Sequence, residues 1–373
     1  MEQYTEKDVL RLGKRIRNNK RSYLLVDPLQ GKHIPVSPTA ACEMSQALGE
    51  LLYREAPEAG LVIGFAETAT AIAAIAALCF PDDTVYVHTT REPLDSDQTV
   101  RFLEEHSHAV DQQVDGSCIA AKQTKTIVMI DDEISTGRTI DNIVTQLRHT
   151  FPFLEEVRFV IGSIINRMEE SVREEMYRKN IHFVSLVQVQ HRDFEAAAQA
   201  LFVHEPTEAP VLTEASYETH QTTAVIPNLR TGVPIGVLRQ EMALFAREVT
   251  GFLTAEGRCR GRVLLLGTEE CMTPAILTGQ YLETQGTSVT VRSHSTTRSP
   301  IGIADTQDYP CRNGYRLHSF YEDGRVTYLY NIDDYDTVVV LTDSRQYLSA
   351  EKAMRQISSL YHDHCQKIYL IRG

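Results

Sequence analysis

One stretch near the middle of the chain, residues 125–140, constrains the fold more than any other part of the sequence. It reads KTIVMIDDEISTGRTI: an apolar run of strand length, two consecutive carboxylates and a turn rich in small hydroxyl residues. Its last residue begins a segment with helical apolar spacing at Ile140, Ile143, Val144 and Leu147. This order predicts a strand that ends at an acidic pair and is joined by a short turn to a helix.

The turn itself offers a place for a phosphate group. Backbone N–H groups at a helix N-terminus have no partner within the helix, and the helix dipole favours negative charge there. A glycine in the turn lets the backbone approach a ligand closely. The candidate phosphate-binding residues are Ser135, Thr136, Gly137, Arg138 and Thr139.

The two carboxylates before the turn, Asp131 and Asp132, suit a sugar. They cannot themselves hold a phosphate, but they can accept hydrogen bonds from vicinal hydroxyls of a sugar whose 5-phosphate lies in the turn. The acids and the turn together therefore predict recognition of a ribose 5-phosphate.

Strand-like and helix-like segments alternate on both sides of this stretch. In the N-terminal half we expect helices over residues 38–54 and 69–80, and strands over 61–63, 85–88 and 158–165. Alternation of this kind predicts a mostly parallel α/β sheet with helices on both faces. Ligands should then gather at the carboxyl ends of its strands.

A second alternating series fills the C-terminal half. Residues 204–227 are rich in Pro, Thr and Glu and show no sustained period, which indicates a linker. Beyond it we expect helices over 237–250, 274–284 and 350–360, and strands over 263–266, 288–292, 337–341 and 367–371. We therefore expect a first domain at 1–205, a linker at 206–227 and a second α/β domain at 228–373.

The two halves share three signals in the same order. The offset is 203 residues from Gly64 to Gly267, 207 from Thr89 to Thr296, and 211 from Thr126 to Thr337. Slowly growing offsets are typical of a duplicated fold with small loop insertions, although chance similarity between two α/β units is the alternative. The second copy lacks the acidic pair and the Ser-Thr-Gly turn, so we expect it to be degenerate and the chemistry to lie in the first half.

Residues 125–140 closely resemble the phosphoribosyl diphosphate (PRPP) motif of type I phosphoribosyltransferases of the orotate phosphoribosyltransferase-like kind. Residues 297–300, TRSP, resemble the signature of the TRSP domain, which follows a phosphoribosyltransferase domain in proteins associated with tellurium-resistance gene clusters. Together the two resemblances cover nearly the whole chain. They imply a Mg²⁺-dependent transferase that moves ribose 5-phosphate from PRPP to a nitrogenous base or analogue and releases diphosphate.

The same resemblance implies roles for residues outside the motif. The turn Phe65, Ala66, Glu67 and Thr68 matches the diphosphate-binding loop, with a plain strand-to-helix turn as the alternative. Arg91 is then a partner of the diphosphate. Mg²⁺ would bridge oxygens of PRPP, with Asp131 and Asp132 nearby, and would need no cage made of protein ligands alone.

Two pairs of residues are further candidates. His106 and His108 lie in residues 92–125, a segment with the length and polarity of the mobile loop that closes over the site in this class. Their imidazoles titrate near neutrality and suit proton transfer, but two neighbouring glutamates make a solvated loop the alternative. Lys32 and His33 are expected either to reach the base from a small N-terminal hood or to form a surface turn.

Composition limits the possible partners. A formal net charge of -13 argues against non-specific binding of nucleic acid. No run approaches the roughly 20 apolar residues needed to span a bilayer, and the N-terminus lacks the core of a signal peptide, so we expect a cytoplasmic protein. The seven scattered cysteines are expected to be free thiols. A homodimer is implied by resemblance alone.

Two other functions fit part of the pattern. A sensor that binds PRPP or a nucleotide without turnover, and signals through its C-terminal domain, would share the acids and the turn. The histidine-bearing loop favours an enzyme. A PRPP-making, kinase-like protein would need an added ATP site, and the sequence offers no phosphate-binding glycine loop for one.

Overall fold

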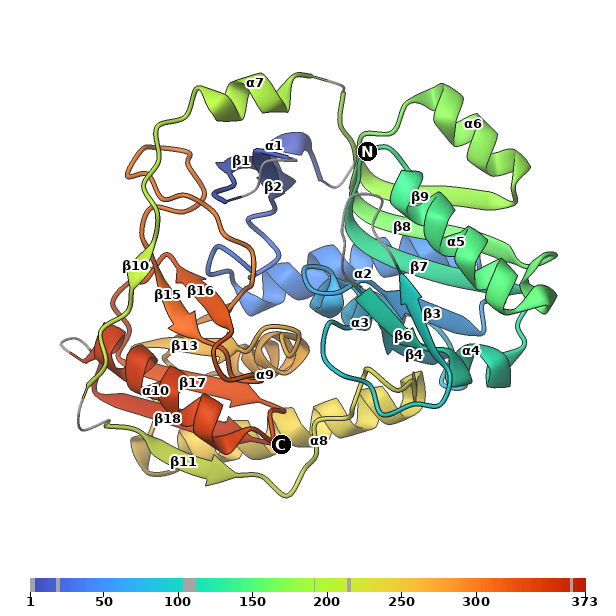
Figure 1. The fold of residues 1–373 in the computed structure, drawn as a ribbon. Helices are drawn as coiled ribbons and strands as arrows, with labels where there is room; N and C mark the ends of the chain where they lie inside the picture. Colours follow the sequence, from blue (N-terminus) through green and yellow to red (C-terminus); the bar gives the residue numbers. More distant parts are fainter. Residues whose placement is uncertain (1–3, 18–20, 103–111, 191, 213–215, 363–364) are drawn as a thin grey trace. The chain divides into compact units, whose positions relative to one another are not determined.

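The computed structural model describes residues 4–17, 21–102, 112–190, 192–212, 216–362 and 365–373 (Figure 1). The chain folds into two compact units, each made of three segments. Unit 1 comprises Met1–Glu6, Glu43–His191 and Pro227–Gln240, and unit 2 comprises Lys7–Cys42, Arg192–Ile226 and Glu241–Gly373.

A six-stranded sheet with the order β12-β4-β3-β7-β8-β9 forms the centre of unit 1. Every neighbouring pair is parallel except the edge pair β12 and β4. The strands are β3 (Leu61–Gly64), β4 (Val85–His88), β7 (Thr126–Ile134), β8 (Arg158–Asn166), β9 (Ile181–Gln188) and β12 (Val233–Pro234). Because β3 lies between β4 and β7, the order of strands reverses there, and such a switch point is where open α/β sheets bind ligands.

Helices cover both faces of this sheet, as the alternating sequence predicted. The apolar stripe of α5 packs in one core cluster with Ile63 and Met129. On the opposite face, Ala73 lies against Gly64 and Leu52 lies against Gly162. The helices of unit 1 are α2 (Pro38–Glu55, which continues from unit 2), α3 (Thr70–Ala77), α4 (Gly116–Lys122), α5 (Arg138–Thr150), the short 3₁₀ turn η1 (Pro152–Leu154) and α6 (Glu170–Arg178).

Residues 92–125, expected as one loop, contain regular structure. An antiparallel hairpin of β5 (Thr99–Phe102) and β6 (Gln112–Asp115) precedes α4. Val100, Phe102 and Val114 are buried in the core cluster, which explains why these segments form strands. His106 and His108 lie outside the described residues.

Unit 2 is built around a five-stranded parallel sheet with the order β11-β18-β17-β13-β14. Its strands are β11 (Glu218–Gln221), β13 (Arg262–Gly267), β14 (Thr290–Ser295), β17 (Thr337–Thr342) and β18 (Lys367–Arg372). A smaller sheet joins β10 (Thr207–Glu208), β15 (Gly314–His318) and β16 (Val326–Tyr330). The remaining elements are α1 (Glu6–Val9, whose first residue belongs to unit 1), β1 (Arg11–Lys14), β2 (Tyr23–Val26), α7 (Phe194–Gln199), α8 (Ile235–Thr254, which begins in unit 1), η2 (Ala255–Gly257), α9 (Thr273–Thr284) and α10 (Tyr347–Tyr361).

The compact units are less continuous in sequence than the expected domains. The expected linker, 206–227, supplies β10 and β11 to the sheets of unit 2. The N-terminal segment Lys7–Cys42 also belongs to unit 2. The division into 1–205, 206–227 and 228–373 stays a prediction. The two compact units are defined by spatial contacts, and these join segments that are distant in sequence.

The main sheets of the two units share one topology. The order β4-β3-β7-β8 in unit 1 corresponds to β14-β13-β17-β18 in unit 2. In both units an antiparallel hairpin lies between the second and third of these strands along the chain. The shared order agrees with the duplication expected from the sequence.

Hydrogen bonds at the carboxyl ends of these strands correspond as well. The N–H of Ala66 donates to Oγ1 of Thr89 at 2.8 Å, and the N–H of Glu269 donates to Oγ1 of Thr296 at 3.0 Å. The next threonine in each unit, Thr90 or Thr297, forms a bridge to the second strand of its hairpin. These pairs have the same offsets, 203 and 207 residues, as the sequence alignment.

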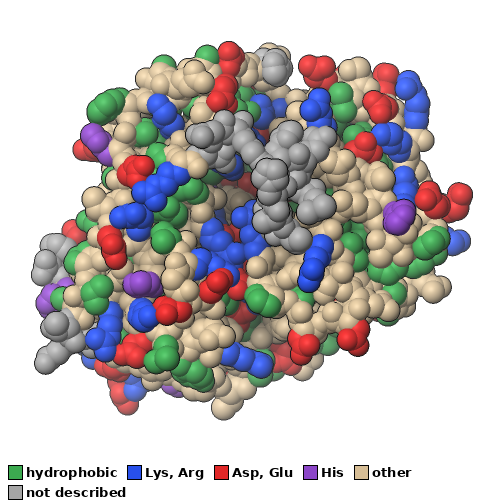
Figure 2. All heavy atoms as spheres, viewed as in Figure 1, with side chains coloured by type: hydrophobic (Ala, Val, Ile, Leu, Met, Phe, Trp, Pro, Cys, Tyr) green, Lys and Arg blue, Asp and Glu red, His purple; other side chains and the backbone are tan. Residues whose placement is uncertain are grey.

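The surface and the cysteines agree with the composition. Acidic and basic side chains are interspersed over the face drawn in Figure 2. All seven cysteines are free. Among the described residues, no helix combines the length and the apolar character that crossing a bilayer requires.

Candidate active site at the carboxyl edge of the first sheet

The ends of β3 and β7 bring two predicted motifs together. Gly64, the last residue of β3, is paired with Ile130 of β7. The N–H of Phe65 donates to the carbonyl of Ile130 at 2.9 Å, so the loop 65–68 begins beside the residue that precedes the acidic pair. From there β7 continues along β8 to Ile134. The loop and the acids therefore meet at the switch point of the sheet.

The acidic pair lies within the extended part of β7 rather than after it. Asp131 and Asp132 are both partly exposed, and extended backbone directs consecutive side chains to opposite faces of the strand. A sugar can contact both carboxylates if it sits at the edge of the sheet. Desolvation of the carboxyl group, and then the charge of Asp132, raise the pKa of Asp131 well above its ordinary value. A carboxylate with a strongly perturbed pKa at the carboxyl edge of a parallel sheet is a candidate for a functional site.

A third carboxylate, Glu133, has a partner that sequence reasoning missed. Nε and Nη2 of Arg167, which directly follows β8, lie 2.9 and 2.8 Å from Oε1 of Glu133. Both side chains are nearly buried, with 8% of Glu133 and 7% of Arg167 exposed. The pair fixes the carboxyl ends of β7 and β8 beside the acids. The sequence does contain a signal for this contact: Glu133 is the third consecutive carboxylate after an apolar run, and a buried charge needs a counter-charge.

The turn between β7 and α5 has the backbone that a phosphate cradle needs. Gly137 is the N-cap of α5 and has φ 75°, the left-handed region. A Cβ at this position would lie 2.7 Å from Sδ of Met168, so space also favours glycine. Ser135 is partly exposed, and Thr136, Arg138 and Thr139 are exposed, which leaves the turn accessible to a ligand.

The loop 65–68 is held from two sides. The hydrogen bond from Ala66 to Thr89 ties it to the end of β4, and Oγ1 of Thr70 donates to the carbonyl of Glu67 at 3.1 Å. The peptide bond between Ala66 and Glu67 is cis. Arg91, two residues after Thr89, is exposed. Because β4 is the neighbour of β3, the loop and the segment that carries Arg91 leave the sheet at the same edge.

Lys32 and His33, the residues expected near the base, belong to unit 2. Each is 1% exposed, so neither forms the surface turn that was the alternative. Nζ of Lys32 donates to the carbonyl of Glu269 at 2.7 Å. Burial lowers the pKa of His33 well below its ordinary value. Their role at a base stays a prediction.

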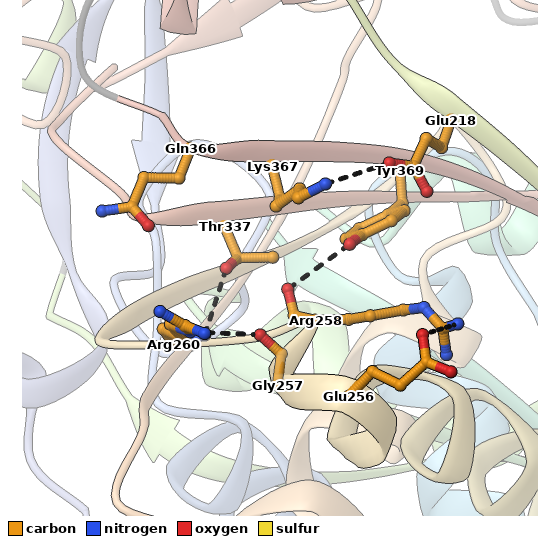
Figure 3. A pocket seen from close by; sticks show the side chains of 9 residues that line it. All are labelled: Glu218, Glu256, Gly257, Arg258, Arg260, Thr337, Gln366, Lys367 and Tyr369. Carbon is orange, nitrogen blue, oxygen red and sulfur yellow. Dashed lines mark hydrogen bonds and ion pairs between the residues drawn. The ribbon is translucent and has the colours of Figure 1, made fainter.

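A pocket of about 410 Å³ lies at the amino end of the main sheet of unit 2 (Figure 3). It is lined by residues at the amino ends of β17 and β18, opposite to the edge where parallel sheets bind ligands. Four of its charged side chains already form two ion pairs: Arg258 contacts Glu256 at 2.7 Å, and Lys367 contacts Glu218 at 3.1 Å. Nε of the fifth, Arg260, donates to the carbonyl of Gly257 at 3.2 Å. We therefore place the candidate site at the carboxyl edge of the first sheet instead.

Two parts of the chain match known protein families. Residues 9–192 match the model of a phosphoribosyl transferase family, and residues 235–358 match the TRSP domain that lies C-terminal to it. The chain is a member of the phosphoribosyltransferase family with a C-terminal TRSP domain. The acids, the turn and the loop 65–68 all lie within the phosphoribosyltransferase match, and Arg298 lies within the TRSP match. None of the curated proteins compared with the chain matches it.

Solved structures similar to the chain include other phosphoribosyltransferases. The orotate phosphoribosyltransferase from Aeropyrum pernix is 21% identical, with 49% of this chain and 89% of that chain covered and a TM-score of 0.32. The adenine enzyme from Giardia lamblia, complexed with 9-deazaadenine, is 14% identical, with 49% and 94% covered and a TM-score of 0.34. The adenine enzyme from Leishmania donovani is 16% identical, with 49% and 78% covered and a TM-score of 0.33.

Proposed function

We propose that unit 1 transfers ribose 5-phosphate from PRPP to a nitrogenous base or analogue and releases diphosphate. The observation that carries the proposal is the meeting of the acidic pair, the phosphate turn and the loop 65–68 at one switch point of the sheet. Membership of the phosphoribosyltransferase family supports the choice of reaction.

Each motif has a part in the transfer. Residues 135–139 hold the 5-phosphate by hydroxyls and N–H groups at the start of α5. Asp131 and Asp132 accept hydrogen bonds from the ribose hydroxyls, and the loop 65–68 with Arg91 faces the diphosphate. The reaction passes through a cationic, oxocarbenium-like transition state, which the two carboxylates stabilise by their charge.

The donor set fits a divalent metal that PRPP brings with it. Mg²⁺ prefers oxygen ligands, keeps several waters, and is usually bound through one or two carboxylates together with substrate phosphates. Asp131 and Asp132 are partly exposed carboxylates at the proposed sugar site, so they would hold Mg²⁺ with PRPP. Bound Mg²⁺ would neutralise charge on the departing diphosphate.

His106 and His108 are proposed to exchange protons with the diphosphate or the nucleophile. In the sequence they lie between β5 and β6, and both strands fall within residues 92–125, the segment expected to have this role. Removal of either imidazole, as in His106→Asn or His108→Asn, should lower transfer at neutral pH while PRPP still binds.

Release of diphosphate tests the reaction. The protein is incubated with PRPP, Mg²⁺ and a panel of nitrogenous bases, and released diphosphate is measured. We expect release with at least one base, loss of release with EDTA, and loss in Asp132→Asn. The matched control is Asp343→Asn at the aligned position of unit 2, where the carboxylate accepts from the hydroxyl of Tyr321 at 2.5 Å. Binding of PRPP without release for every base would contradict the transfer and favour the sensor.

A further inference from the structure

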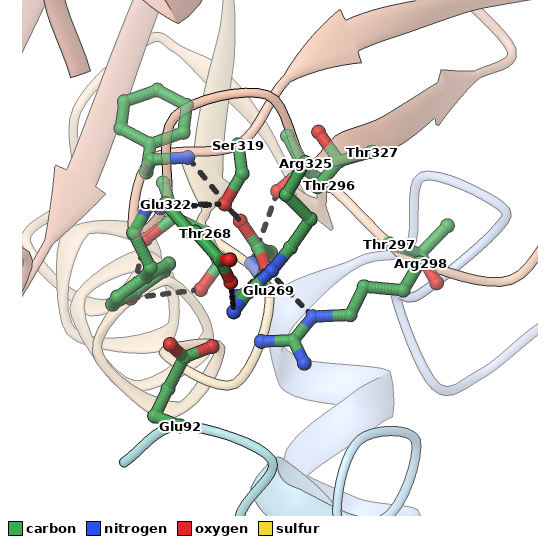
Figure 4. Close-up of polar contacts among 12 residues, drawn as sticks. Glu92, Thr268, Glu269, Thr296, Thr297, Arg298, Ser319, Glu322, Arg325 and Thr327 are labelled. Carbon is green, nitrogen blue, oxygen red and sulfur yellow. Dashed lines mark hydrogen bonds and ion pairs between the residues drawn. The ribbon is translucent and has the colours of Figure 1, made fainter. Parts of the chain in front are cut away.

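The arginine of the TRSP motif belongs to a cluster of cations at the carboxyl end of the second sheet (Figure 4). Nε of Arg298 donates to Oε2 of Glu269 at 2.8 Å. Nη1 of Arg325, from the turn between β15 and β16, lies 3.5 Å from the same oxygen. Nζ of Lys32 donates to the main-chain carbonyl of Glu269. Three cations from three separate segments of unit 2 thus meet at one residue.

Glu269 is built as a fixed anchor. Its side chain is fully buried, and its φ of 49° places a non-glycine residue in the left-handed region. Its other carboxylate oxygen, Oε1, accepts from Oγ of Ser319 at 2.6 Å and from the N–H of Phe320 at 3.2 Å. Since both oxygens are engaged by the protein, Glu269 orients the two guanidinium groups rather than binding a ligand itself.

The two guanidinium groups are shielded from water but still reachable. The side chains of Arg298 and Arg325 are 13% and 18% exposed. Glu322, which is 60% exposed, pairs with Arg325 from its outer side. Charge-assisted hydrogen bonds are stronger in such a partly desolvated place than on an open surface. Two guanidinium groups that share one carboxylate, with Lys32 at the main-chain carbonyl of the same residue, carry more positive charge than that carboxylate offsets, which favours an anionic ligand.

The cluster occupies the place in unit 2 that the loop 65–68 occupies in unit 1. Glu269 corresponds to Ala66 and Arg298 to Arg91, because the hydrogen bonds to Thr89 and Thr296 match. The sugar-phosphate half of the site has no such counterpart, since the positions aligned with the phosphate turn of unit 1 carry Gln346, Tyr347 and Leu348. Unit 2 therefore keeps an oxyanion-binding half without a sugar-phosphate cradle.

We propose that the TRSP domain binds a phosphate-chain oxyanion, either free diphosphate or the diphosphate group of a nucleotide, through Arg298 and Arg325. Glu269 acts as the positioning residue. The choice of diphosphate as the ligand class rests on the proposed function of unit 1, whereas the existence of an oxyanion site rests on the cluster alone.

Calorimetric titration of the full chain with inorganic diphosphate tests the site. We expect two equivalents per chain, one for each unit. Arg298→Gln should weaken one of them by at least about 10-fold, the loss expected for one charge-assisted hydrogen bond. Arg91→Gln, at the aligned position, should weaken the other. Arg355→Gln removes a partly exposed arginine of α10 that pairs with Glu351, and this control should keep both equivalents.

Folding of the variants needs its own control. Loss of Arg298 leaves the buried Glu269 with less compensation, which destabilises a protein. The double variant Glu269→Gln/Arg298→Gln replaces the ion pair by two amides, and its thermal unfolding is measured beside that of Arg298→Gln. A folded double variant that still binds two equivalents with wild-type affinity would overturn the proposal.

The outcomes separate this inference from the function of unit 1. A single equivalent in the wild type that Arg298→Gln loses and Arg91→Gln keeps would support the site in unit 2 while contradicting the diphosphate role in unit 1. A single equivalent that Arg91→Gln loses and Arg298→Gln keeps, or no binding, would overturn the site in unit 2. In Arg91→Gln, ADP that binds more tightly than diphosphate would identify a nucleotide as the source of the oxyanion, and the reverse order would identify free diphosphate.

Discussion

Two adjacent carboxylates that follow the buried part of a strand repel each other when no ligand is present. Asp131 shows the effect, because desolvation and the charge of Asp132 raise its pKa. Bound sugar hydroxyls or a divalent cation would compensate that repulsion. The acidic pair therefore lowers the free energy of unfolding of the ligand-free protein while it provides a site for a ligand.

Replacement of Asp131 should reveal this cost. A carboxyl group with a raised pKa binds its proton more tightly in the folded state, so stability falls as the pH rises from about 3.9, the ordinary aspartate pKa, through the folded pKa. Asp131→Asn should raise the free energy of unfolding at pH 7, by about 1.4 kcal/mol for each unit of raised pKa. The gain should shrink as the pH falls toward about 4.

Denaturant unfolding at several pH values measures this effect. The control is Asp83→Asn, because the side chain of Asp83 is 89% exposed and its replacement should change stability little at any pH. Equal stability of Asp131→Asn and the wild type at pH 7 would show that the acidic pair carries no such cost.

Replacement of Asp132 should affect turnover instead of folding. Hydrogen bonds to a charged acceptor contribute roughly 1.5–3 kcal/mol each, so loss of the charge toward two ribose hydroxyls should lower kcat/KM by about 100-fold or more. The thermal midpoint of Asp132→Asn should equal or exceed that of the wild type, because a like charge is removed. Turnover at the wild-type rate would remove Asp132 from the mechanism.

At the scale of elements, the turn before α5 can be tested by a matched pair of glycine substitutions. Gly137→Ala places a Cβ at positive φ and close to Met168, whereas Gly286→Ala has a similar φ of 64° with no atom within 4 Å. Both should lose about 1 kcal/mol of unfolding free energy from backbone strain. Only Gly137→Ala should also weaken PRPP binding, by about 10-fold or more. Equal PRPP affinity in the two variants would contradict the phosphate cradle.

The ion pair between β7 and β8 is a second element-scale test. Removal of one member of a nearly buried pair costs about 3–5 kcal/mol, so Arg167→Met should be strongly destabilising. A double-mutant cycle with Glu133→Gln should give a coupling energy of at least about 1 kcal/mol. The exposed pair of Arg178 and Glu174 on α6, 4.0 Å apart, should couple by less than about 0.5 kcal/mol. Similar coupling in both pairs would mean that the pair at Glu133 does not fix the strand ends.

The spacing of apolar residues along the sequence was enough to predict helices that bury an apolar stripe. The spacing of Ile140, Ile143, Val144 and Leu147 predicted α5, and all four are buried. β11 was missed, because its four polar residues show no alternation and form a strand through pairing with β18. Elements of that kind depend on a neighbour that is distant in sequence.

The residues of the candidate site also fall into two groups, those that the sequence indicated and those that only the fold brings together. The acids and the phosphate turn are contiguous, so the sequence alone indicated them. The contact of Glu133 with Arg167 joins two strands, and the contact of Lys32 with Glu269 joins residues 237 positions apart. Only the fold brings such pairs together, which is why Lys32 was expected in the first domain and lies buried in unit 2.

At the scale of the whole molecule, the chain carries one sheet topology twice with different chemistry at the two carboxyl edges. Unit 1 has the acids and the left-handed turn of Gly137, whereas unit 2 has the cluster around Glu269. We interpret this as a division of labour after duplication: one copy keeps the site for the sugar phosphate, and the other keeps a site for an oxyanion.

A structure of the protein in complex with PRPP and Mg²⁺ would show whether the sugar phosphate binds at the acidic pair of unit 1. We predict that the 5-phosphate lies in the turn 135–139, the ribose hydroxyls at Asp131 and Asp132, and the diphosphate at the loop 65–68. A complex with the pentose bound in unit 2, or bound in unit 1 away from the acidic pair, would contradict the proposed site.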